Sequence, residues 1–574
     1  MVLSSPCRAK RNDLAGRSDL LKYARSNMQL TENYSPEAKA ASRAISDAIA
    51  ARDHQGAYEQ SEAALARGLV HPIFFNARAL WLERQGRDEE ALADFERALS
   101  LGPRTAIALN AIGLCLTRLQ RLSEAISAFD EAIRLNPTFT PTYHRKGLAL
   151  GMAGDLAAAK RAHEQAVRLN PRDAEALGSL ASLAARKGDA KNTLAYAERA
   201  FRRDPDQPTA LAARAYLDNS EGRFVEAEQF VRPLLGRPDI VGHARAVALG
   251  ILADSLDGQD RVADAFSAYC SENEELHRLH APRFARMRSL TDSTRDLVAY
   301  FQSASRGGWQ TSDDDSGKSE RPRQHVFLLG FYRSGTTLLR QVLAAHTGVL
   351  SLEEHDFLLG PASNYLSDGA TLARLATLSD GDLAAEREAY WRKVKEHGLS
   401  VGGKVFVDKQ PLNTIKLPLI AKLFPQARIV FAIRDPRDVV LSCFRRHFEV
   451  NPGMFELLTL DGAAAFYDAV MQFGELMQPL YARPFFLHRY EDMITNFDRR
   501  VEALCDFLGL QFEPAMREFH TGASAREVRS PSASQVARKL YREGAGQWRR
   551  YDTQLAPVIP ILRRWIEKFG YPAD

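Results

Sequence analysis

The pattern of apolar and polar positions changes near the middle of the chain. Before about residue 300, alanine, leucine and isoleucine recur at the spacing of one helical face, with charged residues between them. Beyond residue 325, short continuous apolar runs stand between helical stretches, at 326–329, 349–352, 405–407, 428–433 and 485–489. Such runs are typical of strands buried on both faces of a parallel sheet. The sequence therefore predicts a helical N-terminal part followed by an α/β part.

A period of 34 residues organises the helical part. The positions that keep it are small residues and prolines: Ala98, Ala132, Ala166 and Ala200, with Pro103, Pro137, Pro171 and Pro205. Small residues let two antiparallel helices approach closely, and a proline ends the second helix of each pair. This pattern resembles a tetratricopeptide repeat array, which implies an α-superhelix whose groove holds a peptide or protein partner.

Shifts in composition predict the domain limits. Residues 1–35 are polar and are expected to form a frayed or disordered lead, and residues 36–300 are assigned to the repeat domain. Residues 301–325 are rich in Ser, Asp, Gly and Arg and are expected to form a linker. Residues 326–574 form the second domain. The predicted fold class is thus α plus α/β, with a P-loop-like C-terminal domain around a central parallel sheet.

Composition narrows the classes of function. The 574 residues are 45% hydrophobic and 26% charged with a net charge of +4, which is typical of a globular protein and gives no global argument for nucleic acid. No apolar run reaches about 18 residues, so no membrane span is expected. The cysteines are odd in number and dispersed, which predicts free thiols and a cytoplasmic location: Cys7, Cys115, Cys270, Cys443 and Cys505.

A glycine-rich turn follows the first apolar run. Residues 330–337 read GFYRSGTT, with glycines five apart, and a helical pattern begins at their end. A strand, a tight turn and a helix N-terminus together make an anion cradle. Thr336 stands where the triphosphate-binding loop G-x-x-x-x-G-K-[ST] has its lysine, which disfavours ATP, GTP and a kinase reaction. The expected anion ligands are Arg333, Ser334, Gly335, Thr336 and Thr337.

A second basic cluster follows the strand expected at 428–433. Arg434 stands at the strand end, Ser442 follows eight residues later, and Arg446 follows four residues after that. Ser442 and Arg446 are expected to share one face of a helix. Two guanidinium groups and a hydroxyl suit a phosphate group.

The turn RSGTT and the spacing R-x7-S-x3-R together resemble the sulfotransferases, and most closely the protein-tyrosine sulfotransferases and their repeat-fused relatives. The resemblance implies 3′-phosphoadenosine 5′-phosphosulfate (PAPS) as the donor, 3′-phosphoadenosine 5′-phosphate (PAP) as its product, and no metal. It implies a general base at Glu354, with Glu353 and His355 left open as alternatives. It also implies a transition-state lysine at Lys409, a cofactor contact at Tyr490 and a serine over the phosphosulfate at Ser532.

The sequence does not identify the acceptor of the sulfuryl group. Tyr332, Asp356 and Gln547 depart from the tyrosine enzymes, and the Asp356 change places an acidic residue where those enzymes have an acceptor-engaging arginine. Protein, glycan, lipid and small-molecule hydroxyls are all compatible with the sequence. The alternative from another class is a repeat scaffold whose cofactor domain serves assembly rather than catalysis.

Overall fold

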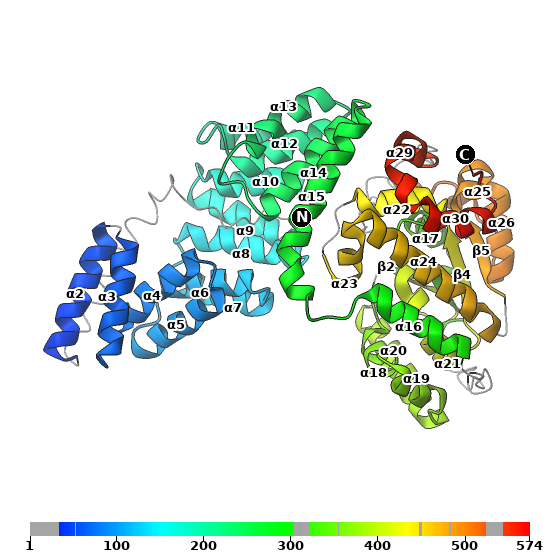
Figure 1. Cartoon of the computed structure of the whole chain (residues 1–574), viewed down its shortest axis with the longest axis horizontal. Helices are drawn as coiled ribbons and strands as arrows, with labels where there is room; N and C mark the ends of the chain where they lie inside the picture. The colour runs from blue at the N-terminus through cyan, green and yellow to red at the C-terminus, as the bar shows by residue number, and fades with distance from the viewer. Residues whose placement is uncertain are drawn as a thin grey trace. The chain divides into compact units, whose positions relative to one another are not determined.

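The computed structural model describes residues 34–51, 53–303, 309, 321–353, 355–446, 450–481, 484–523 and 544–573, with only the backbone of Glu353. The chain divides into two compact units, Met1–Arg261 and Val262–Asp574, each of which can be followed in Figure 1. Within the described residues, no helix is long and apolar enough to cross a membrane.

The first unit is a series of antiparallel helix pairs. Its helices are α2 (Pro36–Ala51), α3 (His54–Ala66), α4 (Pro72–Arg84), α5 (Asp88–Leu101), α6 (Ala106–Arg118), α7 (Leu122–Leu135), α8 (Thr140–Met152), α9 (Leu156–Leu169), α10 (Ala174–Arg186), α11 (Ala190–Phe201), α12 (Pro208–Ser220), α13 (Phe224–Leu235) and α14 (His243–Gly258). Successive even-numbered helices from α4 to α12 begin 34 residues apart, as do the odd-numbered helices from α5 to α13. The period predicted from the sequence is confirmed.

Glycines explain how closely the paired helices approach. A Cβ atom on Gly113 of α6 would lie 2.5 Å from the ring of Phe129 on α7. In the next pair, a Cβ atom on Gly147 of α8 would lie 2.5 Å from the ring of His163 on α9. A ring on the second helix therefore occupies the space that a missing side chain leaves on the first.

The second unit begins earlier than the sequence indicates. It opens with α15 (Val262–Phe284) and α16 (Leu290–Ser303), which the sequence analysis had assigned to the repeat domain. Leu297, Val298 and Phe301 of α16 belong to the same apolar core as Phe327 and Phe406 of the sheet. A helical pattern shows which face of a helix is buried but not which neighbour buries it, so the boundary moves from about residue 300 to Val262.

A five-stranded parallel sheet forms the centre of this unit. Its strands are β1 (Gln324–Gly330), β2 (Val349–Glu353), β3 (Val405–Lys409), β4 (Arg428–Ile433) and β5 (Phe486–Arg489), in the order β2-β3-β1-β4-β5. All five coincide closely with the apolar runs of the sequence. The connection from β1 leads to β2 on one side, whereas β4 pairs with β1 on the other. The carboxyl ends of β1 and β4 therefore flank a topological switch point, where ligands bind in open α/β sheets.

Helices cover both faces of the sheet. The helices of this unit that follow β1 are α17 (Thr336–Ala344), α18 (Leu359–Tyr365), α19 (Gly369–Ala376), α20 (Asp380–Glu396), η3 (Pro411–Lys416), α21 (Leu417–Leu423), α22 (Pro436–Phe444), α23 (Pro452–Phe455), η4 (Glu456–Leu458), α24 (Leu460–Met477), η5 (Gln478–Leu480), α25 (Tyr490–Thr495), α26 (Phe497–Leu508), η6 (Pro514–Met516), α27 (Phe519–Ala523), η7 (Gln547–Tyr551), α29 (Asp552–Leu555), η8 (Ala556–Val558) and α30 (Ile559–Lys568). Phe327 and Phe406 point into one core with α16, α21, α22, α24 and α30, whereas Val326 and Val407 point into the other with α17, α25 and α26. The predicted α/β architecture is confirmed.

Candidate functional site

The glycine-rich turn is fixed where it leaves β1. Gly330 has a φ of 147°, and a Cβ atom there would lie 2.5 Å from the carbonyl oxygen of Ala432 on β4. The Thr414 hydroxyl of η3 donates to the Gly330 carbonyl at 2.7 Å and accepts from the Gly330 amide at 3.1 Å. Only glycine fits this close approach without strain, so the turn begins from a defined point between β4 and η3.

The far end of the turn closes against α25. Gly335 precedes α17 with a φ of 88°, and a Cβ atom there would lie 2.6 Å from the ring of Tyr490. Ser334, Thr336 and Thr337 are all buried. The first amides of α17 have no partner within the helix, so the turn, its hydroxyls and the helix N-terminus can together bind an anion.

Two arginines from separate strand ends meet at this turn. Arg333, with a φ of 62°, donates from Nε to the Ser442 hydroxyl of α22 over 3.0 Å. Arg434, which directly follows β4, donates from Nη1 to the Arg333 carbonyl oxygen over 3.1 Å. The two basic clusters of the sequence therefore lie together at the switch point.

Arg434 contacts the Tyr490 ring and the carbonyl oxygens of Gly544 and Arg333. Its guanidinium carbon lies 5.1 Å from the ring centroid of Tyr490, and Nη2 donates to the Gly544 carbonyl oxygen. The residue is only 9% exposed, and its Nε has no hydrogen-bond partner among the described residues. A buried donor without a partner costs free energy, which an anionic ligand would offset. The site therefore fits a phosphate-bearing ligand.

The expected helix around Ser442 is shorter than the sequence indicates. Ser442 lies in the last turn of α22, but the helix ends at Phe444, so Arg446 lies beyond it rather than on a shared helical face. The Phe444 carbonyl accepts from the side-chain Nδ2 of Asn273 over 2.9 Å, where a longer helix would supply a backbone amide. Arg446 therefore follows the helix end instead of extending the helix.

Lys409 is placed at the carboxyl edge of the sheet. It is the last residue of β3, paired in register with Leu328 of β1 and with Glu353 of β2, and it is 1% exposed. The other two expected catalytic residues, Glu354 and Ser532, lie outside the described residues. His355, the alternative base, has its ring centroid 4.5 Å from that of His397.

An ionic and polar group surrounds the end of β3 next to Lys409. Lys416 of η3 donates to both carboxylate oxygens of Asp356. Asp408 accepts from the Tyr390 hydroxyl at 2.7 Å, and that hydroxyl lies 3.1 Å from Nε2 of His325. Burial raises the pKa of Asp408 to about 7, against the effect of the Tyr390 hydrogen bond. The negative charge of Asp356 is thus paired, whereas Asp408 is buried without a cation bonded to it among the described residues.

The sequence analysis missed one residue that holds the site together. Asp438, in the first turn of α22, accepts from the backbone amides of Gly546 at 2.7 Å and Trp548 at 2.9 Å. Burial raises the pKa of Asp438. These bonds keep the segment that carries the Gly544 carbonyl beside Arg434. The signal in the sequence was the second acid of the RDPRD motif, which lies four residues after Arg434 and 3.9 Å from its guanidinium.

The buried thiol of Cys443 lies next to the two arginines. Burial raises its pKa to about 12, although Arg333 and Arg434 act in the opposite direction. The thiol donates to the Tyr332 carbonyl at 3.8 Å. This cysteine therefore packs the site and is not a nucleophile at neutral pH. Among the described residues, no group of three or more His, Cys, Asp or Glu side chains could hold a metal ion.

Comparisons with known proteins match the two parts of the chain to two families. Residues 325–514 match the sulfotransferase family, and residues 42–103, 76–138 and 144–208 match the tetratricopeptide repeat. An uncharacterized protein of Aquifex aeolicus is 25% identical over 362 residues, which cover 60% of this chain and 45% of that protein. Protein-tyrosine sulfotransferase 2 of Gallus gallus is 24% identical over 263 residues, which cover 42% of this chain and 68% of that enzyme.

The chain thus spans less than half the length of the Aquifex protein that it matches. Among solved structures, the sulfotransferase domain from the curacin biosynthetic pathway aligns with 45% of this chain and 100% of that domain, at 21% identity and a TM-score of 0.33. The two family matches fall on the two units of the structure. The chain therefore joins tetratricopeptide repeats to a domain of the sulfotransferase family.

Proposed function

We propose that the C-terminal unit, Val262–Asp574, transfers a sulfuryl group from PAPS to an acceptor hydroxyl. The observation that carries the proposal is the meeting of Arg333, Ser442 and Arg434 beside a helix N-terminus that lacks the triphosphate-binding lysine. A compact anionic nucleotide fits this set of donors better than a triphosphate does.

Several residues would hold the donor. Residues 333–337, through their amides and hydroxyls, would bind the 5′-phosphosulfate end. Arg434, Ser442 and Arg446 would bind the 3′-phosphate, which a guanidinium can grip with two parallel hydrogen bonds. The Tyr490 ring packs against both Gly335 and Arg434. It would therefore set the distance between the residues that bind the 5′-phosphosulfate and those that bind the 3′-phosphate.

The reaction assigns separate roles to three further residues. PAPS, when bound, supplies the sulfuryl group and departs as PAP. Glu354 would take the proton from the acceptor hydroxyl. Lys409 would place a positive charge where negative charge develops on the leaving nucleotide, and Ser532 would donate to the sulfonate oxygens. Glu353 and His355 remain the alternatives to Glu354 as the base.

The acceptor we favour is not a strongly acidic peptide. Asp356 follows β2 by three residues, and its carboxylate is already bound by Lys416. This neutral pair offers no unpaired cation for acidic side chains beside a target tyrosine. A glycan hydroxyl, or a tyrosine in a less acidic context, is compatible with it. We further propose that the repeats bind a peptide or protein partner, and that the free thiols of Cys115, Cys270, Cys443 and Cys505 belong to a reducing, cytoplasmic setting.

Transfer of labelled sulfur tests this function. The full chain would be incubated with sulfur-labelled PAPS and a cell extract, and labelled products would be separated by mass. We expect product with the unaltered chain and at least a hundredfold less with Glu354→Gln or Lys409→Met, on the scale of lost acid–base and electrostatic catalysis. The exposed α20 residues Glu396 and Lys395 give the matched controls Glu396→Gln and Lys395→Met, which should keep full activity.

The scaffold alternative predicts a different result. In that case the protein would bind PAP, yet no variant and no extract would yield labelled product. ATP-dependent and magnesium-dependent turnover would instead support a kinase and contradict the proposal.

A further inference from the structure

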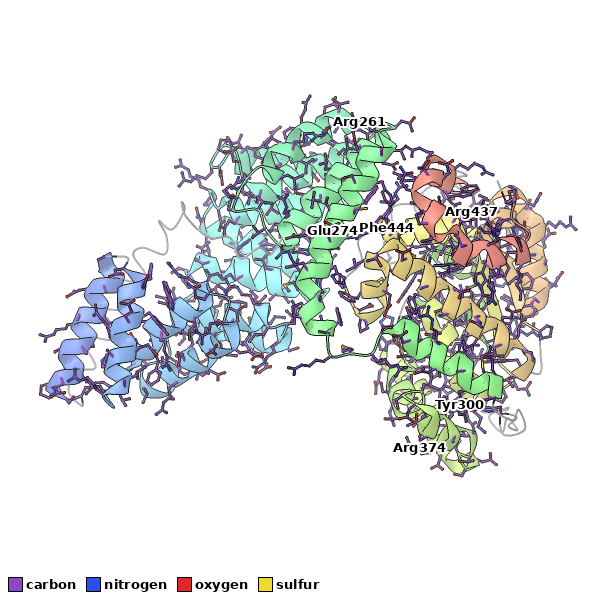
Figure 2. The ribbon with its side chains drawn as sticks, in the orientation of Figure 1. Arg261, Glu274, Tyr300, Arg374, Arg437 and Phe444 are labelled. Atoms are coloured by element: carbon purple, nitrogen blue, oxygen red, sulfur yellow. The ribbon has the colours of Figure 1, made fainter. Side chains whose placement is uncertain are left out.

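Helix α15 packs against the end of the helix that carries Ser442. The ring centroids of Phe266 on α15 and Phe444 on α22 lie 5.4 Å apart in a stacked arrangement. Figure 2 labels Glu274 on α15 and Phe444 on α22. Helix α15 precedes the sulfotransferase-family match in the chain. It thus contacts the end of α22, the helix that carries Ser442 of the candidate cofactor site.

A buried hydrogen bond joins the two helices. Asn273 is 5% exposed and donates from Nδ2 to the Phe444 carbonyl over 2.9 Å. The last carbonyls of a helix have no partner within it, and a buried one must find a partner elsewhere. Asn273 therefore satisfies the carbonyl at which α22 ends, two residues after Ser442 and two before Arg446.

The residue between Phe444 and Arg446 is also held by α15. The guanidinium carbon of Arg445 lies 5.2 Å from the ring centroid of Tyr269 on α15 and 4.9 Å from that of Tyr551 on η7. Arg445 is 8% exposed and Tyr269 is fully buried. Cation–π contacts of this kind strengthen when the partners are desolvated. Contacts from α15 thus hold both Phe444 and Arg445, the two residues that precede Arg446 in the chain.

Further contacts fix α15 and the start of α16 on the same domain. The rings of His277 and Phe284 lie 4.7 Å and 4.9 Å from that of Phe455 on α23. Glu456 of η4 accepts from the Leu290 amide and from the Thr291 hydroxyl, each at 2.8 Å. Asn273 is therefore presented from a helix that is anchored along its length, which is what a positioning residue requires.

We propose that Asn273 is a positioning residue for the 3′-phosphate of the nucleotide, acting through the end of α22 on Ser442 and Arg446. This inference rests on the proposed function, because it assumes that these two residues bind that phosphate. Asn273 touches neither the ligand nor the reacting atoms. Its effect enters where the chain leaves α22, so it should alter recognition of the 3′-phosphate more than recognition of the 5′ end, which is linked to α22 through the Arg333–Ser442 hydrogen bond.

Calorimetric titration of the full chain with two probes tests this. PAP carries both phosphates, whereas adenosine 5′-monophosphate lacks the 3′-phosphate. We expect Asn273→Ala to weaken PAP binding about fivefold, the effect of one lost hydrogen bond, and to change binding of the monophosphate less than twofold. Glu274→Ala is the matched control, because Glu274 is exposed on the neighbouring position of α15 and should leave both affinities unchanged. Arg446→Ala should reduce the preference for PAP over the monophosphate, because it removes one of the three residues assigned to the 3′-phosphate.

The outcomes separate this inference from the function on which it rests. Equal affinity of the unaltered chain for both probes would overturn the proposed 3′-phosphate site and this inference with it. A clear preference for PAP that Asn273→Ala leaves intact, or an equal loss for both probes, would overturn only the positioning role. Asn273→Leu keeps the side-chain volume without the donor and should reproduce the alanine result. It provides the test if the alanine variant does not fold.

Discussion

The Nε atom of Arg333 lies 3.0 Å from the hydroxyl oxygen of Ser442, although the two residues are 109 positions apart in the chain. Arg333 belongs to the turn after β1, and Ser442 belongs to the last turn of α22. The bond therefore joins the two basic clusters that the sequence places at separate strand ends. Any nucleotide that contacts both clusters will depend on this alignment.

Removing the Ser442 hydroxyl should loosen Arg333. We expect Ser442→Ala to reduce the affinity for PAP about fivefold to tenfold, because one hydrogen bond to a charged group is lost and Arg333 must then be ordered by the ligand. Calorimetry measures this change. Ser363→Ala, at an exposed position of α18, should have no effect. An unchanged affinity in Ser442→Ala would show that the bond does not organise the site.

Gly335 should tolerate no side chain. Gly335→Ala would place a Cβ atom 2.6 Å from the Tyr490 ring at a φ of 88°, so we expect PAP binding to fall at least tenfold and the free energy of unfolding to fall by more than about 1 kcal/mol. Gly398 is a matched control, because it has a φ of 78° and open space around it.

Gly398→Ala should therefore show the backbone cost of about 1 kcal/mol alone, with unchanged nucleotide affinity. Urea unfolding and calorimetry on both variants separate the two effects. Equal nucleotide affinity in both variants would contradict the close packing of Tyr490 on the turn.

Asp408 should make stability fall as the pH rises from about 4 to 7. Burial raises its pKa to about 7, so in this range the folded protein keeps a proton that the unfolded chain has lost. The unfolded state then binds fewer protons, and the free energy of unfolding decreases with pH by up to about 4 kcal/mol across the range. Asp408→Asn removes this titration while an amide oxygen can still accept from Tyr390.

Comparing the unaltered chain with Asp408→Asn isolates the contribution of Asp408 to the pH dependence of stability. Burial lowers the pKa of His325 to about 3, which makes stability rise with pH between about 3 and 6.5, but this contribution is common to both proteins. Urea unfolding at several pH values should show Asp408→Asn gaining stability relative to the unaltered chain up to about pH 7. A pH-independent difference would show that Asp408 is ionised in the folded protein.

Local patterns predicted much of the architecture. Proline and alanine positions fixed the 34-residue period, because each repeat carries the same packing requirement, and the helices begin at that period. Continuous apolar runs located the strands, because a sheet covered on both faces excludes polar residues. The polar residues after those runs, such as Arg333 and Arg434, then had to gather at one edge.

Long-range packing could not be predicted in the same way. The sequence shows a helical pattern at 262–303 but not that Phe301 packs on the sheet rather than on the repeats. Asn273 and Asp438 are single polar residues whose partners, the Phe444 carbonyl and the Gly546 amide, are backbone groups. Backbone groups occur at every position and leave no spacing to recognise. For the same reason, the sequence did not predict that α22 ends at Phe444, before Arg446.

Titration of the full chain with PAP, and in parallel with ATP and Mg²⁺, tests most directly whether the glycine-rich turn and the two arginines form a site for a 3′-phosphorylated nucleotide rather than for a triphosphate. PAP should bind, ATP should bind at least a hundredfold more weakly, and Arg333→Ala and Arg434→Ala should each weaken PAP binding tenfold or more, on the scale of a lost charged hydrogen bond. Arg374→Ala is the control, since Arg374 lies on α19 and bonds only within the α18–α19 region among the described contacts (Figure 2). Unchanged PAP affinity in both arginine variants, or ATP binding as tight as that of PAP, would contradict the account.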